Sequence, residues 1–403
     1  MLTLLLSLLL LGPLAVWALL PPASDLLSLV KVILRRSKSV PAAPATFPQL
    51  LLLIPAHNEA QLIERCVASL QAPDHPAGTV SIVVMADNCT DATAELAERA
   101  GARVLRRVDP VRRGKGHAIG WALTQVDWAG RDAVVILDAD TTVGTDYYRR
   151  LAELAPLRAK AVQCYDGLSN EMENWLTRLA GMLTRNRYDL ALPLKQAAGL
   201  RVPLTGDGTL LGSQILARHG WRAGSLTEGW DLYARLTLAG ERVELARGAR
   251  IYAQEARSLE QAGSQRARWT AGRAGVLREN WRGILTSKVI SPHQKLDLFA
   301  ELSAPGPVLS ITVALVGLCV SAIWAPSQAR YWLVGAFAVP LVHQAVFTLI
   351  SLARHPKPTA VLASALRLPF YAVWRVALAA RLMVRGKPKE WARTERHDEG
   401  TRP

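Results

Sequence analysis

The chain has 403 residues, half of them hydrophobic, and a formal net charge of +15. This length allows one large domain or two ordinary ones in addition to membrane segments, because domains usually have roughly 100–200 residues. The basic residues form no long run and many lie beside apolar segments, which favours contact with a membrane and disfavours a nucleic-acid-binding protein. The four cysteines show no metal-ligand spacing, so neither a zinc site nor a disulfide framework is expected.

The first apolar segment covers residues 2–20, which are almost entirely Leu, Ala, Val and Trp. Its length approaches the roughly 30 Å of membrane hydrocarbon. A cleaved signal peptide is the competing interpretation. We favour an uncleaved anchor over residues 1–34, because no basic residue precedes the apolar run and Lys31, Arg35 and Arg36 follow it. This order of charges predicts that the following domain lies in the cytoplasm.

After a linker at residues 41–44, three short apolar runs alternate with helix-like stretches. Continuous apolar runs of this length are typical of strands that are buried on both faces of a parallel sheet. The alternation therefore predicts an α/β domain over residues 48–255, with a mostly parallel sheet flanked by helices. The runs are residues 50–54, 82–85 and 134–137, and the helix-like stretches are residues 59–71, 91–100 and 114–126.

Beyond residue 255 the chain becomes basic and amphipathic, and residues 256–300 are expected to form helices at a membrane surface. A C-terminal membrane region follows at 304–384, with apolar spans near 305–324 and 331–353.

The last hydrophobic segment, residues 359–384, is interrupted by Arg367, Arg375 and Arg381. At about 100° per residue these arginines fall within roughly one third of the helix circumference, so the segment is expected to lie along the interface. This keeps the basic tail, residues 385–403, in the cytoplasm and gives three spanning helices. Whether residues 359–384 cross the membrane is left open by the sequence.

Each of the three apolar runs is followed by acidic residues, and in open parallel sheets ligands bind beyond the carboxyl ends of the strands. One such carboxylate is often only a helix cap, but three in succession indicate a binding site. The segments are Pro55-Ala56-His57-Asn58-Glu59, Asp87-Asn88-Cys89-Thr90-Asp91 and Asp138-Ala139-Asp140.

Asp138 and Asp140 are separated by one residue directly after the third run. Both carboxylates can turn toward one site across a local bend. Mg²⁺ and Mn²⁺ are often held by one or two carboxylates together with substrate phosphates. The pair therefore predicts a divalent cation site.

The segment Arg113-Gly114-Lys115-Gly116-His117 places two cations and two glycines ahead of an expected helix. This arrangement can hold a diphosphate through charge and backbone N–H groups. A solvated basic turn is the alternative interpretation. The chain contains no Walker A sequence, which disfavours an ATPase.

These motifs, in this order, resemble the family 2 glycosyltransferases, whose catalytic domain has the GT-A fold. The resemblance covers about residues 48–285. It extends to Thr205-Gly206-Asp207-Gly208, which resembles a glycine-rich loop on the acceptor side. It also includes Gln265-Arg266-Ala267-Arg268-Trp269, which matches the QxxRW signature of membrane-bound bacterial members.

The resemblance implies a role for each matching residue. The donor, a UDP-sugar, would contact Glu59 and Asp87, with the cation on its diphosphate held by Asp140. Arg268 and Trp269 would lie near the leaving diphosphate and the acceptor. The complete expected set is Pro55, His57, Glu59, Asp87, Asn88, Lys115 and Asp138 for the donor, Gly206, Asp207, Gln265, Arg268 and Trp269 for acceptor and diphosphate, and Asp138 and Asp140 for Mg²⁺ or Mn²⁺.

One departure concerns the catalytic base. Members with QxxRW usually carry Thr-Glu-Asp before the last catalytic helix, and that Asp takes the acceptor proton. Here the chain reads Thr227-Glu228-Gly229-Trp230-Asp231, with Gly229 at the expected position. Either Glu228 or Asp231 acts as the base, or the protein is inactive. Acidic residues at the first turn of a helix are also favoured by the macrodipole alone.

The expected function is an inverting hexosyltransferase in the inner or plasma membrane, multi-pass, that uses a UDP-sugar and a lipid, lipid-linked or polysaccharide acceptor. Three spanning helices offer little from which to build a channel, which favours a lipid product unless a partner subunit or an oligomer contributes. The alternative is a catalytically silent subunit that binds sugar nucleotides within a glycan synthase complex. The sequence does not identify the sugar, the acceptor or the number of transfers.

Overall fold

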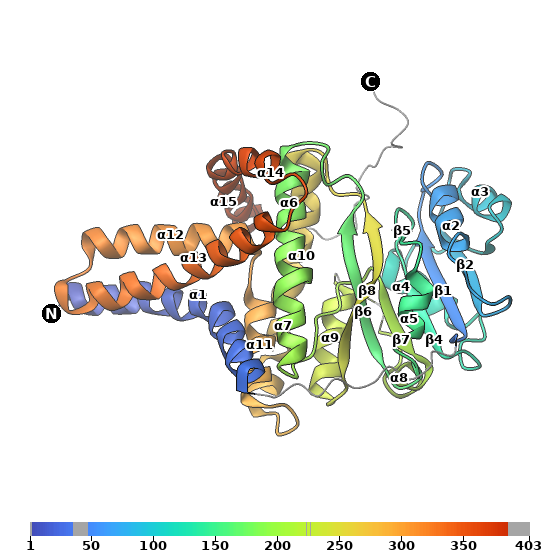
Figure 1. Cartoon of the computed structure of the whole chain (residues 1–403), viewed down its shortest axis with the longest axis horizontal. Helices are drawn as coiled ribbons and strands as arrows, with labels where there is room; N and C mark the ends of the chain where they lie inside the picture. Colours follow the sequence, from blue (N-terminus) through green and yellow to red (C-terminus); the bar gives the residue numbers. More distant parts are fainter. Residues whose placement is uncertain (1, 35–46, 223, 226, 386–403) are drawn as a thin grey trace. The chain divides into compact units, whose positions relative to one another are not determined.

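The computed structural model describes residues 2–34, 47–222, 224–225 and 227–385 (Figure 1). The linker expected at residues 41–44 and the tail from residue 386 onward lie outside the described residues. The chain divides into two compact units. The membrane unit contains residues 2–34, 172–200 and 273–385, and the sheet unit contains residues 47–171 and 201–272. Residues 172–200, inside the domain expected at 48–255, thus belong to the membrane unit.

The sheet unit is built on an eight-stranded mixed sheet with the order β3-β2-β1-β4-β7-β6-β8-β5. β1 is parallel to β2 and β4, β2 to β3, and β6 to β8, whereas β7 and β5 pair antiparallel with their neighbours. The expected α/β fold is confirmed. The strands are β1 (Leu50–Ala56), β2 (Val80–Asp87), β3 (Arg103–Arg107), β4 (Ala133–Ile136), β5 (Thr142–Val143), β6 (Ala161–Leu168), β7 (Thr209–Gly212) and β8 (Val243–Ala253).

The apolar runs form central strands because both faces of the sheet are covered. Leu52, Leu53 and Ile54 of β1 are fully buried, as expected for a parallel strand between two layers of helices. The helices that contribute to this unit are α2 (Ile63–Gln71), α3 (Thr93–Arg99), α4 (Lys115–Ala122), α5 (Tyr147–Ala152), α8 (Ser213–His219), α9 (Glu228–Leu238) and the first half of α10 (Leu259–Thr286).

The register of β1 brings the polar strand ends together. Ala56 at the end of β1 lies beside Ala86 of β2, and Leu53 lies beside Ile136 at the end of β4. Because these strands are parallel, the residues that follow all three emerge at one edge of the sheet.

The membrane unit is helical, and three of its helices are long and apolar enough to cross a membrane. These candidate spans are Leu4–Leu34, Pro307–Trp324 and Ser327–Ala353, among the residues that the structure describes. The helices of this unit are α1 (Leu2–Leu34), α6 (Trp175–Arg185), the π-helix η1 (Asn186–Ala191), α7 (Leu192–Ala197), α11 (Pro292–Ser303), α12 (Pro307–Trp324), α13 (Ser327–Ala353), α14 (Pro358–Ala365) and α15 (Leu368–Arg385), together with the second half of α10.

Small residues allow the spans to pack closely. A Cβ atom at Gly317 of α12 would come within 2.5 Å of the Phe337 ring of α13. Ala15 and Ala18 of α1 pack into the same cluster as Phe337. Close approach at small residues is the usual way in which membrane helices associate.

The last hydrophobic segment is bent: α14 and the described part of α15 meet at 53°. Two of its arginines face the protein, since Arg375 is buried and donates to the Pro305 carbonyl oxygen at 3.0 Å, and Arg367 lies 5.5 Å from the Trp175 ring. Leu366 and Val373 are exposed. The segment thus turns an apolar side outward, as a helix in contact with lipid does.

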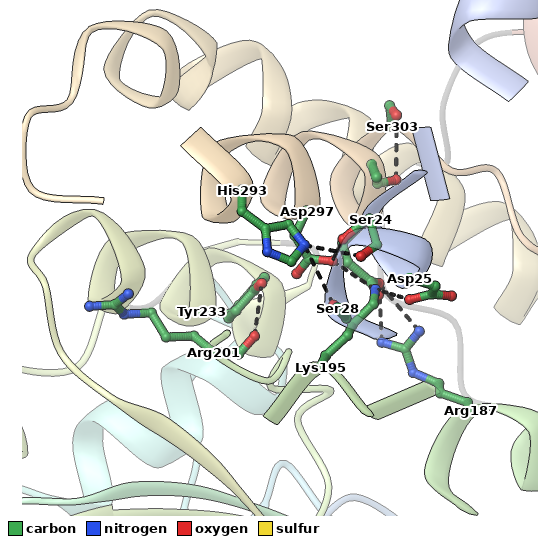
Figure 2. A network of polar contacts seen from close by, with 12 residues as sticks. Ser24, Asp25, Ser28, Arg187, Lys195, Arg201, Tyr233, His293, Asp297 and Ser303 are labelled. Carbon is green, nitrogen blue, oxygen red and sulfur yellow. Dashed lines mark hydrogen bonds and ion pairs between the residues drawn. The ribbon is translucent and has the colours of Figure 1, made fainter. Parts of the chain in front are cut away.

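A buried ion network joins α1, α7 and α11 within the membrane unit (Figure 2). The Lys195 Nζ atom lies 2.8 Å from both Asp297 Oδ1 and Glu301 Oε1, and 3.8 Å from Asp25 Oδ1. Burial alone would raise the pKa of Glu301, but Arg187 and Lys195 outweigh it and lower that pKa to about 2. Lys195 is therefore the central cation of this network.

We expect Lys195→Met to destabilise the membrane unit by about 3–5 kcal/mol, because it removes the cation that is paired with the buried Asp297 and leaves Glu301 with Arg187 alone. The check is the thermal unfolding midpoint of the full chain in detergent micelles. The matched control is Arg106→Gln, which breaks an exposed ion pair with Glu98 and should change the midpoint little. A midpoint for Lys195→Met as close to wild type as that of the control would contradict the assignment.

Candidate active site

The ends of β1 and β2 are joined by side-chain contacts. His57 Nδ1 lies 2.7 Å from the Asp87 carbonyl oxygen, and the Asn58 side chain accepts a hydrogen bond from the Thr90 N–H at 2.7 Å. Asn58 and Asn88 both have left-handed backbones, with φ of 56° and 51°. Asparagine tolerates this conformation better than most residues, so both turns are tightly shaped.

The Asp87 carboxylate is held by a residue that sequence reasoning missed. Arg107 pairs with Asp87 across the β2–β3 register, and its Nη1 atom lies 2.5 Å from Asp87 Oδ1, with both side chains buried. Its Nη2 atom donates to Asp109 Oδ2 at 2.7 Å and to the Arg112 carbonyl oxygen at 2.8 Å. Arg107 therefore braces both the Asp87 strand end and the loop that leads to Lys115.

The other expected donor residues lie at the same strand ends. Pro55 is inside β1, opposite Met85, and Asn88 donates to Asp87 Oδ1 at 3.0 Å. The Glu59 backbone N–H donates to Thr93 Oγ1 at 2.8 Å, just before α2. The structure thus brings these residues to one edge of the sheet, as the sequence predicts.

Asp207 organises the turn that carries Asp138 and Asp140. Its Oδ1 atom accepts hydrogen bonds from the Asp138 and Gly208 N–H groups, both at 2.9 Å, and its Oδ2 atom accepts from Thr141 Oγ1 at 2.6 Å. Two of these three hydrogen bonds come from the turn after β4, so the Asp207 carboxylate links its own loop to that turn.

The site concentrates negative charge. Burial and the neighbouring Asp138 raise the pKa of Asp207 to about 7, although Lys115 partly offsets them. Burial also raises the pKa of Asp166 on β6, and the carboxylates of Asp207, Asp138 and Asp140 raise it further. Sequence reasoning missed Asp166, because only the pairing of β6 with β7 and β8 brings it to this cluster.

The acidic cluster fits a divalent cation that takes the rest of its ligands from a substrate. Within the described ranges, no group of three or more His, Cys, Asp and Glu side chains is arranged so that it could hold a metal ion. Asp138 and Asp140 supply hard oxygen donors, and a cation beside them would relieve the repulsion that raises the neighbouring pKa values. Mg²⁺ and Mn²⁺ are the cations that this donor set suits.

Lys115, the first residue of α4, reaches this cluster with its side chain. Its Nζ atom contacts the Asp138 carboxylate and donates to the Gly206 carbonyl oxygen at 3.2 Å. Burial would lower the pKa of Lys115, but Asp138 and Asp207 outweigh it, so the pKa lies above its usual value. The Lys115 side chain therefore holds a positive charge between the turn that carries Asp138 and the loop that carries Gly206.

The Glu228 carboxylate lies against the start of the same helix. Its Oε1 atom accepts a hydrogen bond from the Gly116 N–H at 3.0 Å, and a Cβ atom at residue 116 would come within 2.8 Å of it. Asp231, in contrast, is buried and pairs with Arg235 of its own helix at 3.0 Å. The Glu228 carboxylate therefore contacts the start of α4, whereas the Asp231 carboxylate contacts a residue of its own helix, α9.

The backbone explains why residue 229 is glycine. A Cβ atom there would lie 2.5 Å from the Gly206 nitrogen and 2.8 Å from the Leu204 carbonyl oxygen, and both of these are backbone atoms. The loop after residue 204 thus occupies the space of the missing side chain.

We expect Gly229→Asp to destabilise the sheet unit by about 1–3 kcal/mol and to leave activity unimproved, because the loop at 204–206 must move to admit a side chain. The thermal midpoint and the rate of donor turnover test this. The control is Gly130→Asp, in an exposed turn, where a Cβ atom meets only the flexible Asp127 side chain. If Gly229→Asp gained activity at an unchanged thermal midpoint, the loop at 204–206 would accommodate the side chain without cost, and this explanation of Gly229 would be wrong.

The QxxRW residues, 265–269, lie in the first half of α10. Trp269 is partly exposed, and the Arg266 guanidinium lies 4.9 Å from its ring and 3.0 Å from Glu255 Oε1. Gln265 Oε1 is buried and accepts no hydrogen bond within the described part of the chain. The roles of Gln265, Arg268 and Trp269 at the leaving diphosphate stay a prediction.

Residues 48–272 match the protein-family model described as "Glycosyltransferase like family 2". The beta-monoglucosyldiacylglycerol synthase of Synechocystis sp. is 28% identical over 269 residues, which are 65% of this chain and 55% of that protein. An N-acetylglucosaminyltransferase of Rhizobium leguminosarum bv. viciae is 33% identical over 162 residues, 38% of this chain and 36% of that protein. The chain spans about half the length, or less, of these curated relatives.

Among solved structures, the chain is similar to the mannosyltransferase PcManGT from Pyrobaculum calidifontis, which was solved with GDP-Man and Mn²⁺. The TM-score is 0.56 at 20% identity, and the alignment covers 94% of this chain and all of that one. At this identity the likeness shows the fold, which is of the GT-A type.

Proposed function

Because the chain belongs to the family 2-like glycosyltransferases, we propose that it transfers a sugar from a UDP-sugar to a lipid or lipid-linked acceptor with inversion. The observation that carries this proposal is the convergence of Lys115, Asp138 and Asp207 at the carboxyl edge of the sheet. The carboxylates can bind a divalent cation, and the fixed Lys115 cation can bind the diphosphate that this cation carries. The two groups together therefore suit a metal-bound diphosphate better than either would alone.

Asp138 and Asp140 would hold Mg²⁺ or Mn²⁺, which supplies Lewis-acid stabilisation to the departing diphosphate. Lys115 adds positive charge to the same group. Arg268 and Trp269 complete the expected set on the acceptor side. Asp207 keeps the Asp138–Thr141 turn in place through the two hydrogen bonds that it accepts from Asp138 and Thr141.

Glu228 is our choice for the catalytic base. Its carboxylate contacts the first turn of α4, next to Lys115, whereas the carboxylate of Asp231 is paired with Arg235. A base must lie within hydrogen-bond reach of the acceptor hydroxyl. Glu228 lies next to Lys115, where the donor diphosphate is expected, so it is better placed than Asp231 to reach that hydroxyl. Removal of the acceptor proton by Glu228 allows the oxygen to attack the anomeric carbon in a single displacement, which inverts its configuration.

A lipid acceptor is supported by two independent observations. The described residues contain three candidate spans, and the Synechocystis relative is named as a beta-monoglucosyldiacylglycerol synthase. We place the sheet unit on the cytoplasmic side of the plasma or inner membrane, because Lys31, Arg35 and Arg36 follow the first apolar run.

The second candidate function is a catalytically silent subunit that binds sugar nucleotides. Gly229 favours it, because the usual acid is absent and the loop at 204–206 fills its place. The test is UDP release by the purified full chain from a panel of UDP-sugars, with membrane lipid extract and Mn²⁺ or Mg²⁺. Release that requires both metal and lipid supports the transferase. Donor binding without release on any sugar supports the silent subunit.

A further inference from the structure

Helix α1 is longer than a membrane crossing requires. Its 33 residues extend for about 50 Å, whereas the hydrocarbon layer is roughly 30 Å thick. Pro21 and Pro22 lie inside the helix, and Figure 1 shows α1 changing direction near its middle. Residues 2–20 are long enough for one crossing, so a crossing does not require the segment after the prolines.

The segment after the prolines, residues 23–34, buries a polar stripe against the membrane unit. Ser24 and Ser28 have no exposed surface, and Ser24 Oγ donates to Asp297 Oδ1 at 2.8 Å. Asp25 Oδ2 lies 3.0 Å from the His343 Nε2 atom, and its Oδ1 atom faces Lys195 (Figure 2). These contacts fix which side of the helix faces the protein.

The opposite side of the same segment is apolar and exposed. Leu26, Ile33 and Leu34 are 61%, 72% and 77% exposed. A contiguous apolar face of this length marks a surface that contacts another apolar partner, such as a protein or a lipid bilayer. The complete exposed set is Leu26, Leu27, Leu29, Val30, Ile33 and Leu34.

We propose that residues 23–34 form a surface helix that binds the bilayer interface, with this apolar side in the acyl boundary. The occupant is the lipid surface because the segment continues directly from the first span. Its charge also fits anionic headgroups, since Lys31 lies in the segment and Arg35, Arg36 and Lys38 follow in the sequence. The buried ion network then fixes the helix to the membrane unit from the opposite side. This inference does not depend on the proposed reaction.

The experiment measures the depth of single labelled cysteines in the full chain, reconstituted in nanodiscs of neutral and anionic lipid. Cys319, which is exposed, is first replaced by serine, and the protein without an added cysteine is the blank. A fluorophore is placed at Leu26→Cys or at Ile33→Cys, and Leu9→Cys in the first half of α1 marks the deep position. Lipids carrying a spin label near the headgroup or at the chain end then quench each fluorophore. Leu29→Cys replaces Leu26→Cys if that variant fails to assemble.

The surface helix predicts equal, shallow quenching at residues 26 and 33, and deep quenching at residue 9. Replacing the anionic lipid by neutral lipid should weaken the shallow quenching. The equilibrium constant for binding of the helix to the bilayer surface should fall by roughly fivefold for each basic side chain that contacts anionic headgroups. A helix that continues across the membrane would place the two labels about 10 Å apart in depth. That result overturns the proposal. Quenching by aqueous iodide alone, or protection from every quencher as under a protein partner, also overturns it.

Discussion

Asp140→Asn is expected to reduce donor turnover by about 10²–10³-fold, because it removes one of the two carboxylates that would hold the cation. Asparagine keeps the size of the side chain and one oxygen, so the fold should persist. The measurement is the initial rate of UDP release at increasing Mn²⁺ concentrations, with the thermal midpoint as a check on folding.

The control for this variant is Asp74→Asn, which changes an exposed aspartate outside the acidic cluster. It should turn over the donor at the wild-type rate. The metal assignment is wrong if Asp140→Asn, folded and saturated with Mn²⁺, is as active as this control.

Glu228→Gln is expected to lower turnover by about 10²–10⁴-fold, the range for loss of a general base. Glutamine can still accept the hydrogen bond from the Gly116 N–H, so the variant separates proton removal from the structural contact. Donor binding should be unchanged, since the loss falls on the chemical step. The measurement is the rate constant at saturating donor together with the donor dissociation constant.

Asp231→Asn is the matched comparison at the other candidate acid. It should retain most of its turnover per folded molecule, with its main effect on stability through Arg235. The opposite pattern, in which folded Asp231→Asn is inactive and Glu228→Gln is active, would assign the base to Asp231. Inactivity of the wild-type chain with every donor would instead favour the silent subunit.

The sequence predicts the strand ends well because their signal is local. A continuous apolar run such as residues 50–54 is typical of a strand that is buried on both faces of a sheet. The polar residues that follow it then lie at the carboxyl end of that strand. Asp138 and Asp140 are therefore recognisable without any knowledge of the sheet order. The mostly parallel fold follows from the same alternation of runs and helices.

Other features depend on distant partners and have no local signal. Arg107 looks like one of several basic residues in β3 until the register pairs it with Asp87. Residues 172–200 lie between β6 and β7 in the sequence, yet they pack with the membrane helices through residues such as Lys195. The glycine at 229 is explained only by the backbone of residues 204–206.

The central claim is sugar transfer to a lipid, and the most direct measurement is the product itself. Purified full chain in nanodiscs is incubated with Mn²⁺, a panel of UDP-sugars and membrane lipids, and the lipids are analysed by mass spectrometry and NMR. The account predicts a new glycolipid with the anomeric configuration opposite to that of the donor, absent with Asp140→Asn. UDP release without any glycosylated lipid, or a product that retains the donor configuration, would contradict it.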